Sequence, residues 1–271
     1  MILKFYKYQG AGNDFVLVDA RGNGLKFTRE QVARLCDRRF AIGADGFMAL
    51  EDDPSGADFY MRYFNANGGE TEMCGNGGRC ISLFAHHLGI GGEVKTFNSL
   101  DGAHTAEMLE THGNTGRVRL RMIDVEGYEV RDNYVFLNTG VPHYVEFVGN
   151  VDAVDVSGRG RPIRYSEPFV PYGGTNVNFV QILPDGAIRI RTYERGVEGE
   201  THACGTGAVA AAIATGIVCD PNKREYTVHA VGGDLRVTFE RSGERAFTRI
   251  YLEGPAARVF ECALNPDEIF D

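Results

Sequence analysis

The sequence lacks any apolar run that approaches the roughly 20 residues needed to cross a membrane. Its first residues, MILKFYKYQGAGNDF, hold a short apolar run that charge and glycine soon interrupt, unlike a secretory signal peptide. Positive charge is also scarce, because 28 Lys and Arg stand against 37 Asp and Glu, for a net charge of −9. Such a balance argues against a nucleic-acid-binding surface. We therefore expect a cytoplasmic protein with no membrane or nucleic-acid partner.

Cysteine and cofactor signatures are sparse as well. Six cysteines in 271 residues make no disulfide scaffold, and a reducing cytosol keeps thiols reduced. No glycine-rich dinucleotide fingerprint follows the first predicted strand, and no metal-ligand spacing is visible. We expect neither a cofactor nor a metal. The hydrophobic content of 43% is ordinary for a soluble globular protein and is enough to bury a core.

One stretch is written twice. Residues 63–77, YFNANGGETEMCGNG, and residues 193–207, YERGVEGETHACGTG, agree without a gap at seven of fifteen positions. In both copies a cysteine, Cys74 or Cys204, is followed by Gly-x-Gly and then by a small-residue or apolar run typical of a helix. This repeat predicts two lobes that face one another, each presenting one thiol at a helix start.

Strand patterns surround both motif helices. The stretch RVRLRM at 117–122 alternates arginine with apolar residues, which indicates one buried and one solvated face. The second motif helix, 208–216, has almost no polar face and must be covered on all sides. An earlier helix begins at Thr28, since Gln31 follows at capping-box spacing. The strands that we predict are 4–8, 15–19, 47–50, 58–64, 93–97, 104–109, 117–122, 135–138, 144–148, 176–183, 187–193, 226–230, 235–239 and 247–252.

These elements predict an α+β fold of two pseudo-symmetric lobes. Each lobe is expected to be an antiparallel β-sheet wrapped around a central apolar helix, with the active site in the cleft between the lobes. The boundary falls within 115–127, on Gly116 and on the restart of the strand series. The lobes are therefore 1–116 and 117–256.

A thiol at a helix start is suited to acid–base chemistry. A free thiol titrates near pH 8.5, and the N–H groups of a helix N-terminus lower that pKa and also bind anions. Two such starts would hold a carboxylate and place one sulfur on each side of the neighbouring carbon. Inverting a stereocentre there needs a base on one face and an acid on the other, which a thiolate and a thiol supply in either direction. Hydrogen bonds to the carboxylate would stabilise the carbanion.

Other roles for these side chains remain open at this point. A zinc site from Cys74, Cys80, His86 and His87 would have x5 spacings along one helix, which fit no common zinc pattern. A disulfide between the two motifs would be oxidative damage rather than design in a reducing cytosol. The remaining cysteines are most simply core or inert thiols, and they are Cys36, Cys80, Cys219 and Cys262.

The chain resembles the diaminopimelate epimerase family in eight separated motifs that follow the family's order along its whole length. They are Gly12-Asn13-Asp14-Phe15, Ile42-Gly43-Ala44-Asp45-Gly46, Phe64-Asn65-Ala66, Cys74-Gly75-Asn76-Gly77, Pro142-His143, Gly174-Thr175-Asn176-Val177-Asn178-Phe179, and Glu194-Arg195-Gly196 ahead of Ala203-Cys204-Gly205-Thr206-Gly207. The resemblance implies a cofactor-independent isomerase that interconverts LL- and meso-diaminopimelate. It also implies a homodimer, and a C-terminal segment, 257–271, that packs back on the first lobe.

The resemblance also implies roles for single residues. Cys74 and Cys204 would be the acid and base thiols, and His143 and Glu194 would tune them. The reacting carboxylate would be held by the backbone N–H groups of Gly75, Asn76, Gly205 and Thr206. The far end of the substrate would be held by Asn13, Asn65, Asn178 and Arg195, with Glu194 on its ammonium group.

Several of these residues have plainer alternatives. His143 could be a packed loop histidine, Glu194 and Arg195 an ordinary surface ion pair, and the asparagines turn or cap residues. What favours function is position, because Arg195 lies nine residues before Cys204, as Asn65 lies nine before Cys74.

Two positions depart from the family's pattern. Many members have Asn directly before the Pro-His pair, where this chain has Val141, which offers no side-chain hydrogen bond. Some have Gln where Gly46 stands, so only a backbone contact could be inherited there. Both changes concern the distal end of the substrate and leave the thiol chemistry untouched.

Two rival functions remain. Proline and hydroxyproline racemases share the paired Cys-Gly motifs, but typically carry His where Asn76 stands and lack the Glu-Arg-Gly. An arginine aimed at a second carboxylate suits a two-headed substrate and not proline. A non-catalytic anion-binding module would explain the glycines and Arg195 but would leave both thiols without a role.

Overall fold

Two units make up the chain, and the first also includes its C-terminal part. The structure is a computed structural model that describes residues 2–265. Of these residues, one unit runs as far as Leu120 and also takes in 255–265, and the other is Arg121–Gly254. Residues 266–271 of the segment expected to return to the first lobe lie outside the described residues. No helix within 2–265 is long and apolar enough to span a membrane.

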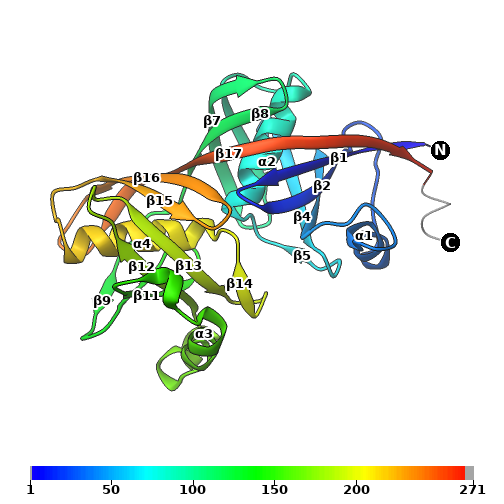
Figure 1. Ribbon diagram of the computed structural model, residues 1–271. Helices are drawn as coiled ribbons and strands as arrows, with labels where there is room; N and C mark the ends of the chain where they lie inside the picture. Colours follow the sequence, from blue (N-terminus) through cyan, green and yellow to red (C-terminus); the bar gives the residue numbers. More distant parts are fainter. Residues whose placement is uncertain (1, 266–271) are drawn as a thin grey trace. The chain divides into compact units, whose positions relative to one another are not determined.

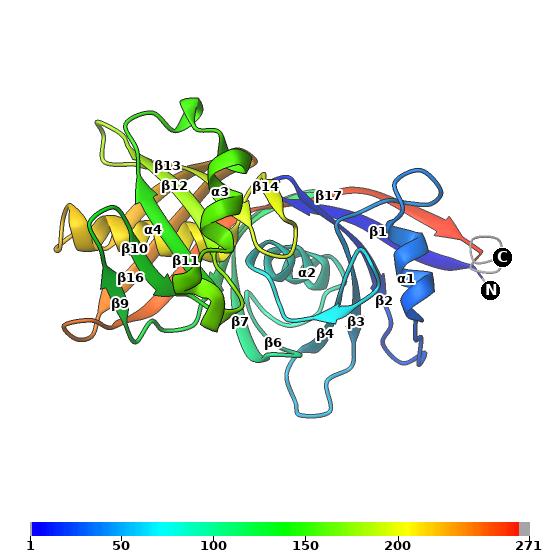
Figure 2. The ribbon, with the colours of Figure 1, turned by 90° about the horizontal axis from the view of Figure 1, so that it is seen from below.

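The first unit is a ring of strands around a helix. Its elements are β1 (Leu3–Gly10), β2 (Asn13–Asp19), α1 (Arg29–Cys36), β3 (Gly46–Glu51), β4 (Phe59–Asn65), β5 (Glu70–Thr71), α2 (Gly75–His87), β6 (Val94–Ser99), β7 (Gly102–His112), β8 (Thr115–Arg121) and the second part of β17 (Phe247–Leu264). The pairing runs β1-β2-β3-β4-β6-β7-β8-β17, and β17 pairs back with β1 to close the ring. The helix α2 lies inside it and contacts β1, β2, β3 and β7 (Figures 1 and 2).

The second unit repeats this plan. Its elements are β9 (Tyr128–Val130), β10 (Val135–Asn138), β11 (Pro142–Phe147), η1 (Val151–Ala153), α3 (Val156–Arg164), η2 (Glu167–Tyr172), β12 (Asn176–Ile182), β13 (Ile188–Glu194), β14 (Gly199–Thr201), α4 (Gly205–Val218), β15 (Glu225–Ala230), β16 (Gly233–Arg241) and the first part of β17. The pairing runs β9-β10-β11-β12-β13-β15-β16-β17, and Phe247 of β17 bridges to Val125 ahead of β9. The helix α4 contacts β10, β11, β12, β13, β15 and β16.

The two units match strand by strand, which confirms the predicted α+β fold of two pseudo-symmetric lobes around central helices. One detail differs, because the sheets are mixed. β2 pairs with β3 and β4 with β6 in parallel, as do β11 with β12 and β13 with β15. The physical reason is connection length. Each of these pairs is joined through a helix, and a crossover of that kind connects parallel neighbours, whereas short turns connect antiparallel ones.

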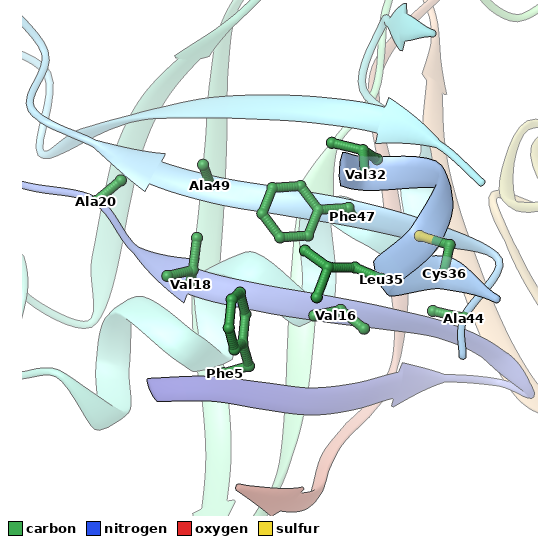
Figure 3. Packing of buried hydrophobic residues seen from close by; sticks show 10 residues of the cluster. All are labelled: Phe5, Val16, Val18, Ala20, Val32, Leu35, Cys36, Ala44, Phe47 and Ala49. Atoms are coloured by element: carbon green, nitrogen blue, oxygen red, sulfur yellow. The ribbon is translucent and has the colours of Figure 1, made fainter. Parts of the chain in front are cut away.

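The short helix α1 is stabilised at its N-terminus by two reciprocal hydrogen bonds. Thr28 accepts a hydrogen bond from the backbone of Gln31, and the Gln31 side chain accepts one from the Thr28 backbone, so the predicted capping box is confirmed. The buried face of the helix packs on the β1–β3 sheet (Figure 3). That packed cluster comprises Phe5, Val16, Val18, Ala20, Val32, Leu35, Cys36, Ala44, Phe47 and Ala49.

The helix α4 is covered all round, as its missing polar face predicts. Every residue of Ala208–Gly216 is buried. Each fully buried aliphatic side chain, such as Val209 or Ile213, contributes about 1.5–3 kcal/mol of hydrophobic stabilisation. The first unit's α2 is likewise buried from Gly75 to Ala85. Both helices therefore hold their N-terminal cysteines on a rigid core element.

Candidate active site

The first thiol is the N-cap of α2. The sulfur of Cys74 accepts the backbone N–H of Gly77 at 3.2 Å and lies 3.9 Å from the Tyr63 hydroxyl. An N–H group directed at sulfur at a helix N-terminus stabilises the thiolate over the thiol. A Cβ at position 77 would lie 3.1 Å from that sulfur, closer than side chains normally approach. The glycine therefore leaves the sulfur room in the first turn.

Behind this thiol, two asparagines far apart in the sequence meet. Asn76 is 4% exposed, and its Nδ2 donates to Oδ1 of Asn13 at 3.2 Å. Asn13, at the start of β2, donates in turn to Asp45 at 2.8 Å. On the other side, Oδ1 of Asn76 accepts from Arg79 at 2.9 Å. Two predicted substrate-binding residues thus belong to one hydrogen-bonded chain at the start of α2.

A cluster of charges fixes the loop that carries Asn13. Arg38 bonds both Asp14, at 2.6 Å, and Asp45, at 2.8 Å, while Lys7 pairs with Asp14 at 2.7 Å. Burial opposes ionisation of Asp14, but the hydrogen bonds from Arg38 and Lys7 outweigh it and hold its pKa well below the ordinary range. The loop is therefore held by permanent charges at neutral pH.

Asn65 lies at the exposed end of β4, opposite Gly46 of β3. A Cβ at position 46 would come within 2.7 Å of the Tyr63 ring and 2.9 Å of the Phe64 carbonyl. This position therefore takes no side chain in the present packing. Only its backbone can contribute, which gives a physical reason for the departure from the family's pattern.

The second thiol is the N-cap of α4. The sulfur of Cys204, which is 8% exposed, lies 3.5 Å from the Thr206 hydroxyl. Thr139 holds the Thr206 carbonyl at 2.9 Å. A Cβ at Gly207 would come within 2.6 Å of Oδ1 of Asn178 and 3.2 Å of the Cys204 sulfur. The structure thus places Cys204, Thr206 and Asn178 together at one helix start.

His143 lies beside this start and is completely buried. Its Nδ1 accepts from Nδ2 of Asn178 at 3.1 Å, and Asn178 is itself fixed by the Tyr144 carbonyl and the Thr192 hydroxyl, both at 2.9 Å. Burial, with a smaller effect from the charge of Arg195, lowers the pKa of His143 to about 3. The imidazole is therefore neutral at physiological pH. Since Nδ1 accepts, the proton is on Nε2, which has no hydrogen-bond partner among the described residues.

Glu194 is the last residue of β13 and Arg195 follows it, and hydrogen bonds to neighbouring groups hold both. The backbone N–H of Arg195 donates to Asn176 at 2.8 Å, and its guanidinium donates to the Tyr172 carbonyl at 3.0 Å. Glu194 accepts from the Thr201 hydroxyl at 2.7 Å. These contacts orient both side chains through backbone and hydroxyl groups.

The structure thus gathers most predicted site residues around the two helix starts. In the first unit these are Cys74, Gly75, Asn76 and Asn13, and in the second Cys204, Gly205, Thr206, Asn178 and His143. The sequence analysis missed Arg79, Arg38 and Asp45 as members of the network. The available signal for Arg79 was its charge, which is isolated in the otherwise apolar run GRCISLFA.

Two of the remaining cysteines are buried thiols, and the proposed zinc ligands do not form a metal site among the residues that the structure describes. Burial raises the pKa of the Cys36 thiol to about 12 and also raises that of Cys80, so both are inert at neutral pH. His87 bonds the Tyr8 hydroxyl at 2.6 Å and the Gly113 carbonyl at 3.0 Å. Within residues 2–265 no group of three or more His, Cys, Asp or Glu could hold a metal ion, so the zinc alternative is wrong there.

Solved structures share the fold of this chain at low sequence identity. A Bacillus anthracis phenazine biosynthesis protein of the PhzF family aligns with a TM-score of 0.76 and 16% identity, over 98% of this chain and 99% of its own. A probable proline racemase from Agrobacterium radiobacter aligns with a TM-score of 0.71 and 16% identity, over 97% and 93%. At these identities the likeness concerns the fold alone.

Sequence comparison gives the family. A curated diaminopimelate epimerase from Flavobacterium psychrophilum is 46% identical over 97% of this chain and 100% of its own length. One from Aquifex aeolicus is 40% identical over 98% and 99%. The family model described as diaminopimelate epimerase matches residues 5–122 and 135–259. The chain belongs to the diaminopimelate epimerase family.

Proposed function

We propose that this protein is a diaminopimelate epimerase, an isomerase that interconverts LL- and meso-2,6-diaminopimelate without pyridoxal phosphate, in the synthesis of lysine and of peptidoglycan precursors. The observation that carries the proposal is the matched pair of helix starts. In each unit a strand and a turn lead to a cysteine that is the N-cap of a buried helix. Relatives of that name, alike over nearly the full chain, support the choice of substrate.

The reaction is inversion at one α-carbon by two bases. In our proposal the thiolate of one cysteine removes the α-proton, and the thiol of the other delivers a proton to the opposite face, so Cys74 and Cys204 exchange roles between the two directions. The first-turn N–H groups at Gly75, Asn76, Gly205 and Thr206 bind the α-carboxylate and stabilise the negative charge that spreads onto it.

We assign the tuning of the second thiol to His143, which is a neutral imidazole, and to Glu194. The completely buried His143 has its proton on Nε2, and this N–H has no partner in the described chain. A neutral imidazole beside the second helix start can influence the thiol without the full positive charge that would hold the sulfur permanently ionised. Such tuning suits a group that must be thiol in one direction and thiolate in the other.

The distal end of diaminopimelate carries a second carboxylate and a second ammonium group. We assign the carboxylate to Arg195 with Asn13, Asn65 and Asn178, and the ammonium to Glu194. Val141 contributes only apolar contact there. We further propose that the enzyme is a cytoplasmic homodimer.

A proline or hydroxyproline racemase remains the main rival, because such enzymes have this fold. Arg195 argues against it, since proline has no second carboxylate to pair with a guanidinium. The deciding experiment incubates the purified, reduced protein separately with LL-diaminopimelate and with L-proline, and separates the stereoisomers by chiral chromatography. Formation of meso-diaminopimelate with proline unchanged is the expected result. Racemised proline would replace our proposal with the rival, and no conversion of either would favour a binding module.

A further inference from the structure

Arg79 is a buried cation at the start of α2. It lies five residues after Cys74 and is 0% exposed. Its Nη1 donates to the Gly75 carbonyl at 3.0 Å, its Nη2 to Oδ1 of Asn76 at 2.9 Å, and its Nε to the Pro255 carbonyl at 3.3 Å. All of these acceptors are neutral. The hydrogen bonds fix the guanidinium in place, but within residues 2–265 none of its hydrogen-bond acceptors is a carboxylate that would compensate its charge.

A buried charge of this kind is costly, with a penalty of several kcal/mol per ion after relaxation. Burial lowers the pKa of Arg79 to about 10, so the group is still a cation at neutral pH. The ionisable groups that act on it are the thiols of Cys80 and Cys74 and the guanidinium of Arg117. Burial keeps Cys80 protonated. Among these groups, the thiol at the helix start is the one that can supply the missing negative charge.

The same two hydrogen bonds also set the geometry of the proposed carboxylate-binding turn. Arg79 grips Gly75 through its carbonyl and Asn76 through its side chain, and Asn76 in turn holds Asn13. Gly75 and Asn76 are also the residues of α2 whose backbone N–H groups we assign to the substrate carboxylate. The guanidinium of Arg79 therefore holds the residues that bind the substrate. A change at Arg79 would disturb that turn even though its side chain is shielded from solvent.

The second unit lacks this device. The repeat offset of 130 residues that relates Cys74 to Cys204 relates Arg79 to Val209, which is apolar and fully buried. A purely structural need of the fold for a cation at this place would apply to both helices. The fold of α4 meets the same packing demands without one. The cation is therefore specific to the Cys74 helix.

We propose that Arg79 is a positioning residue of the epimerase: it holds the first turn of α2 in its carboxylate-binding shape and places a fixed positive charge behind Cys74 that favours its thiolate. The role in carboxylate binding rests on the proposed function, but the effect of the charge on the Cys74 thiol does not. In the free enzyme Cys74 is then the thiolate. Cys204, which has Val209 at the repeat position of Arg79, is the thiol.

The test compares full-length wild type with Arg79→Met and Arg79→Lys, and with Arg119→Met as a control that removes a half-exposed arginine of the same unit. Cys74 and Cys204 are alkylated with iodoacetamide across pH 5–10, and each peptide is quantified by mass spectrometry. Arg79→Met should raise the Cys74 titration midpoint by about one pH unit or more, roughly a tenfold loss of thiolate at neutral pH. The Cys204 midpoint and the control should not move.

Turnover gives the second readout. In Arg79→Met the acid limb of the kcat/KM profile should move upward in pH together with the Cys74 midpoint. Arg79→Lys keeps the charge but loses the two-pronged grip, so its Cys74 midpoint should stay near wild type while KM rises several-fold. Should Arg79→Met fail to fold, Arg79→Lys decides, since an unchanged KM in that variant contradicts the positioning role.

The outcomes separate the two proposals. A shifted Cys74 midpoint in a protein that does not act on diaminopimelate would overturn the function but keep the role of Arg79 in setting the thiol. A working epimerase whose Cys74 midpoint and pH profile are unaffected by Arg79→Met would overturn the inference and leave Arg79 as a packing residue.

Discussion

The starts of α2 and α4 follow the same plan with different electrostatics. Each has a cysteine N-cap followed by Gly-x-Gly and a buried helix. In α2 the sulfur of Cys74 accepts an N–H from Gly77, and the buried cation Arg79 lies one turn on. In α4 that cation is replaced by Val209. A duplicated fold can therefore give two chemically identical thiols different resting states, which a two-base reaction requires at the start of each turnover.

The difference extends to the strand beside each helix start. The repeat offset places His143 of the second unit where the first has Asn13. Asn13 belongs to a network held by permanent charges, whereas His143 is a neutral, completely buried imidazole joined to Asn178. Asn13 is thus held by ion-paired side chains, whereas the hydrogen-bond partner of His143 is the neutral side chain of Asn178.

Removing either thiol should have the largest effect. Cys74→Ala and Cys204→Ala should each lower the epimerisation rate by at least the 10²- to 10⁴-fold typical of a lost acid–base group, roughly to background. A site with one base cannot complete inversion, so the two variants should be equally inactive. Polarimetric or chromatographic assay of each variant checks this. Full activity in either would show that the two helix starts are not equivalent partners.

The distal contacts should be weaker and unequal. Arg195 and Asn65 occupy the same place in the repeat, nine residues before their cysteines. Arg195→Ala removes a charged hydrogen bond and should raise KM about 10- to 100-fold, while Asn65→Ala removes a neutral one and should raise it about 2- to 10-fold. Steady-state kinetics on LL-diaminopimelate measures both. An unchanged KM in Arg195→Ala would remove that residue from the substrate site.

The two units should respond differently to acid. The pKa of His143 is lowered from 6.5 to about 3 in the folded protein. As the pH falls, the unfolded chain therefore takes up a proton at this histidine before the folded protein does. Its stabilising contribution is full above pH 6.5 and is lost as the pH falls toward 3. Asp14 of the first unit also has a lowered pKa, but its contribution is lost only below about pH 4.

Urea unfolding at pH 7.5 and pH 5 measures this contrast. The wild type should lose stability between the two, and His143→Gln, which does not titrate, should lose less. His229→Gln, which changes a partly exposed histidine of the same unit, is the control. Equal losses in wild type and His143→Gln would mean that His143 does not take up a proton on unfolding.

The smallest effects should come from the helices α1 and α3, which carry no proposed catalytic residue. Thr28 caps α1, and Asp155 caps α3 by accepting from Gly158 at 2.9 Å. Substituting either with Ala should cost about 1 kcal/mol of unfolding free energy with little change in kcat. Thermal or urea denaturation measures the loss. A marked loss of activity in Thr28→Ala would show that α1 does more than support the sheet.

Patterns confined to one segment were readable from the sequence. The capping box at Thr28 rests on two residues three apart, and the burial of α4 on its lack of polar side chains. Gly89, which follows the C-cap of α2 with a φ of 72°, is a local signal of the same kind, because a glycine in the left-handed conformation commonly terminates a helix. The repeat around the two cysteines gave the two-lobed plan, since equal sequences impose equal local structure.

Features that depend on tertiary packing were missed. The helix α3, VSGRGRPIR, contains two glycines and a proline, which are poor helix formers. It forms because Asp155 caps it and because it packs on β13, where a Cβ at Gly160 would meet the Tyr193 side chain at 2.5 Å. The parallel pairings and the bond between Asn13 and Asn76 join segments distant in sequence, so no local pattern reports them.

The most direct test of the two-base account is proton NMR of LL-diaminopimelate in D₂O with the reduced protein and no added cofactor. The account predicts that the first meso product carries deuterium at the inverted α-carbon while the remaining LL substrate keeps its proton. The thiol that protonates the opposite face has already exchanged its proton for deuterium from the solvent. The thiolate that removes the α-proton can return only that same proton to the LL substrate. Product that retains the substrate's own α-proton, or no product at all, would contradict it.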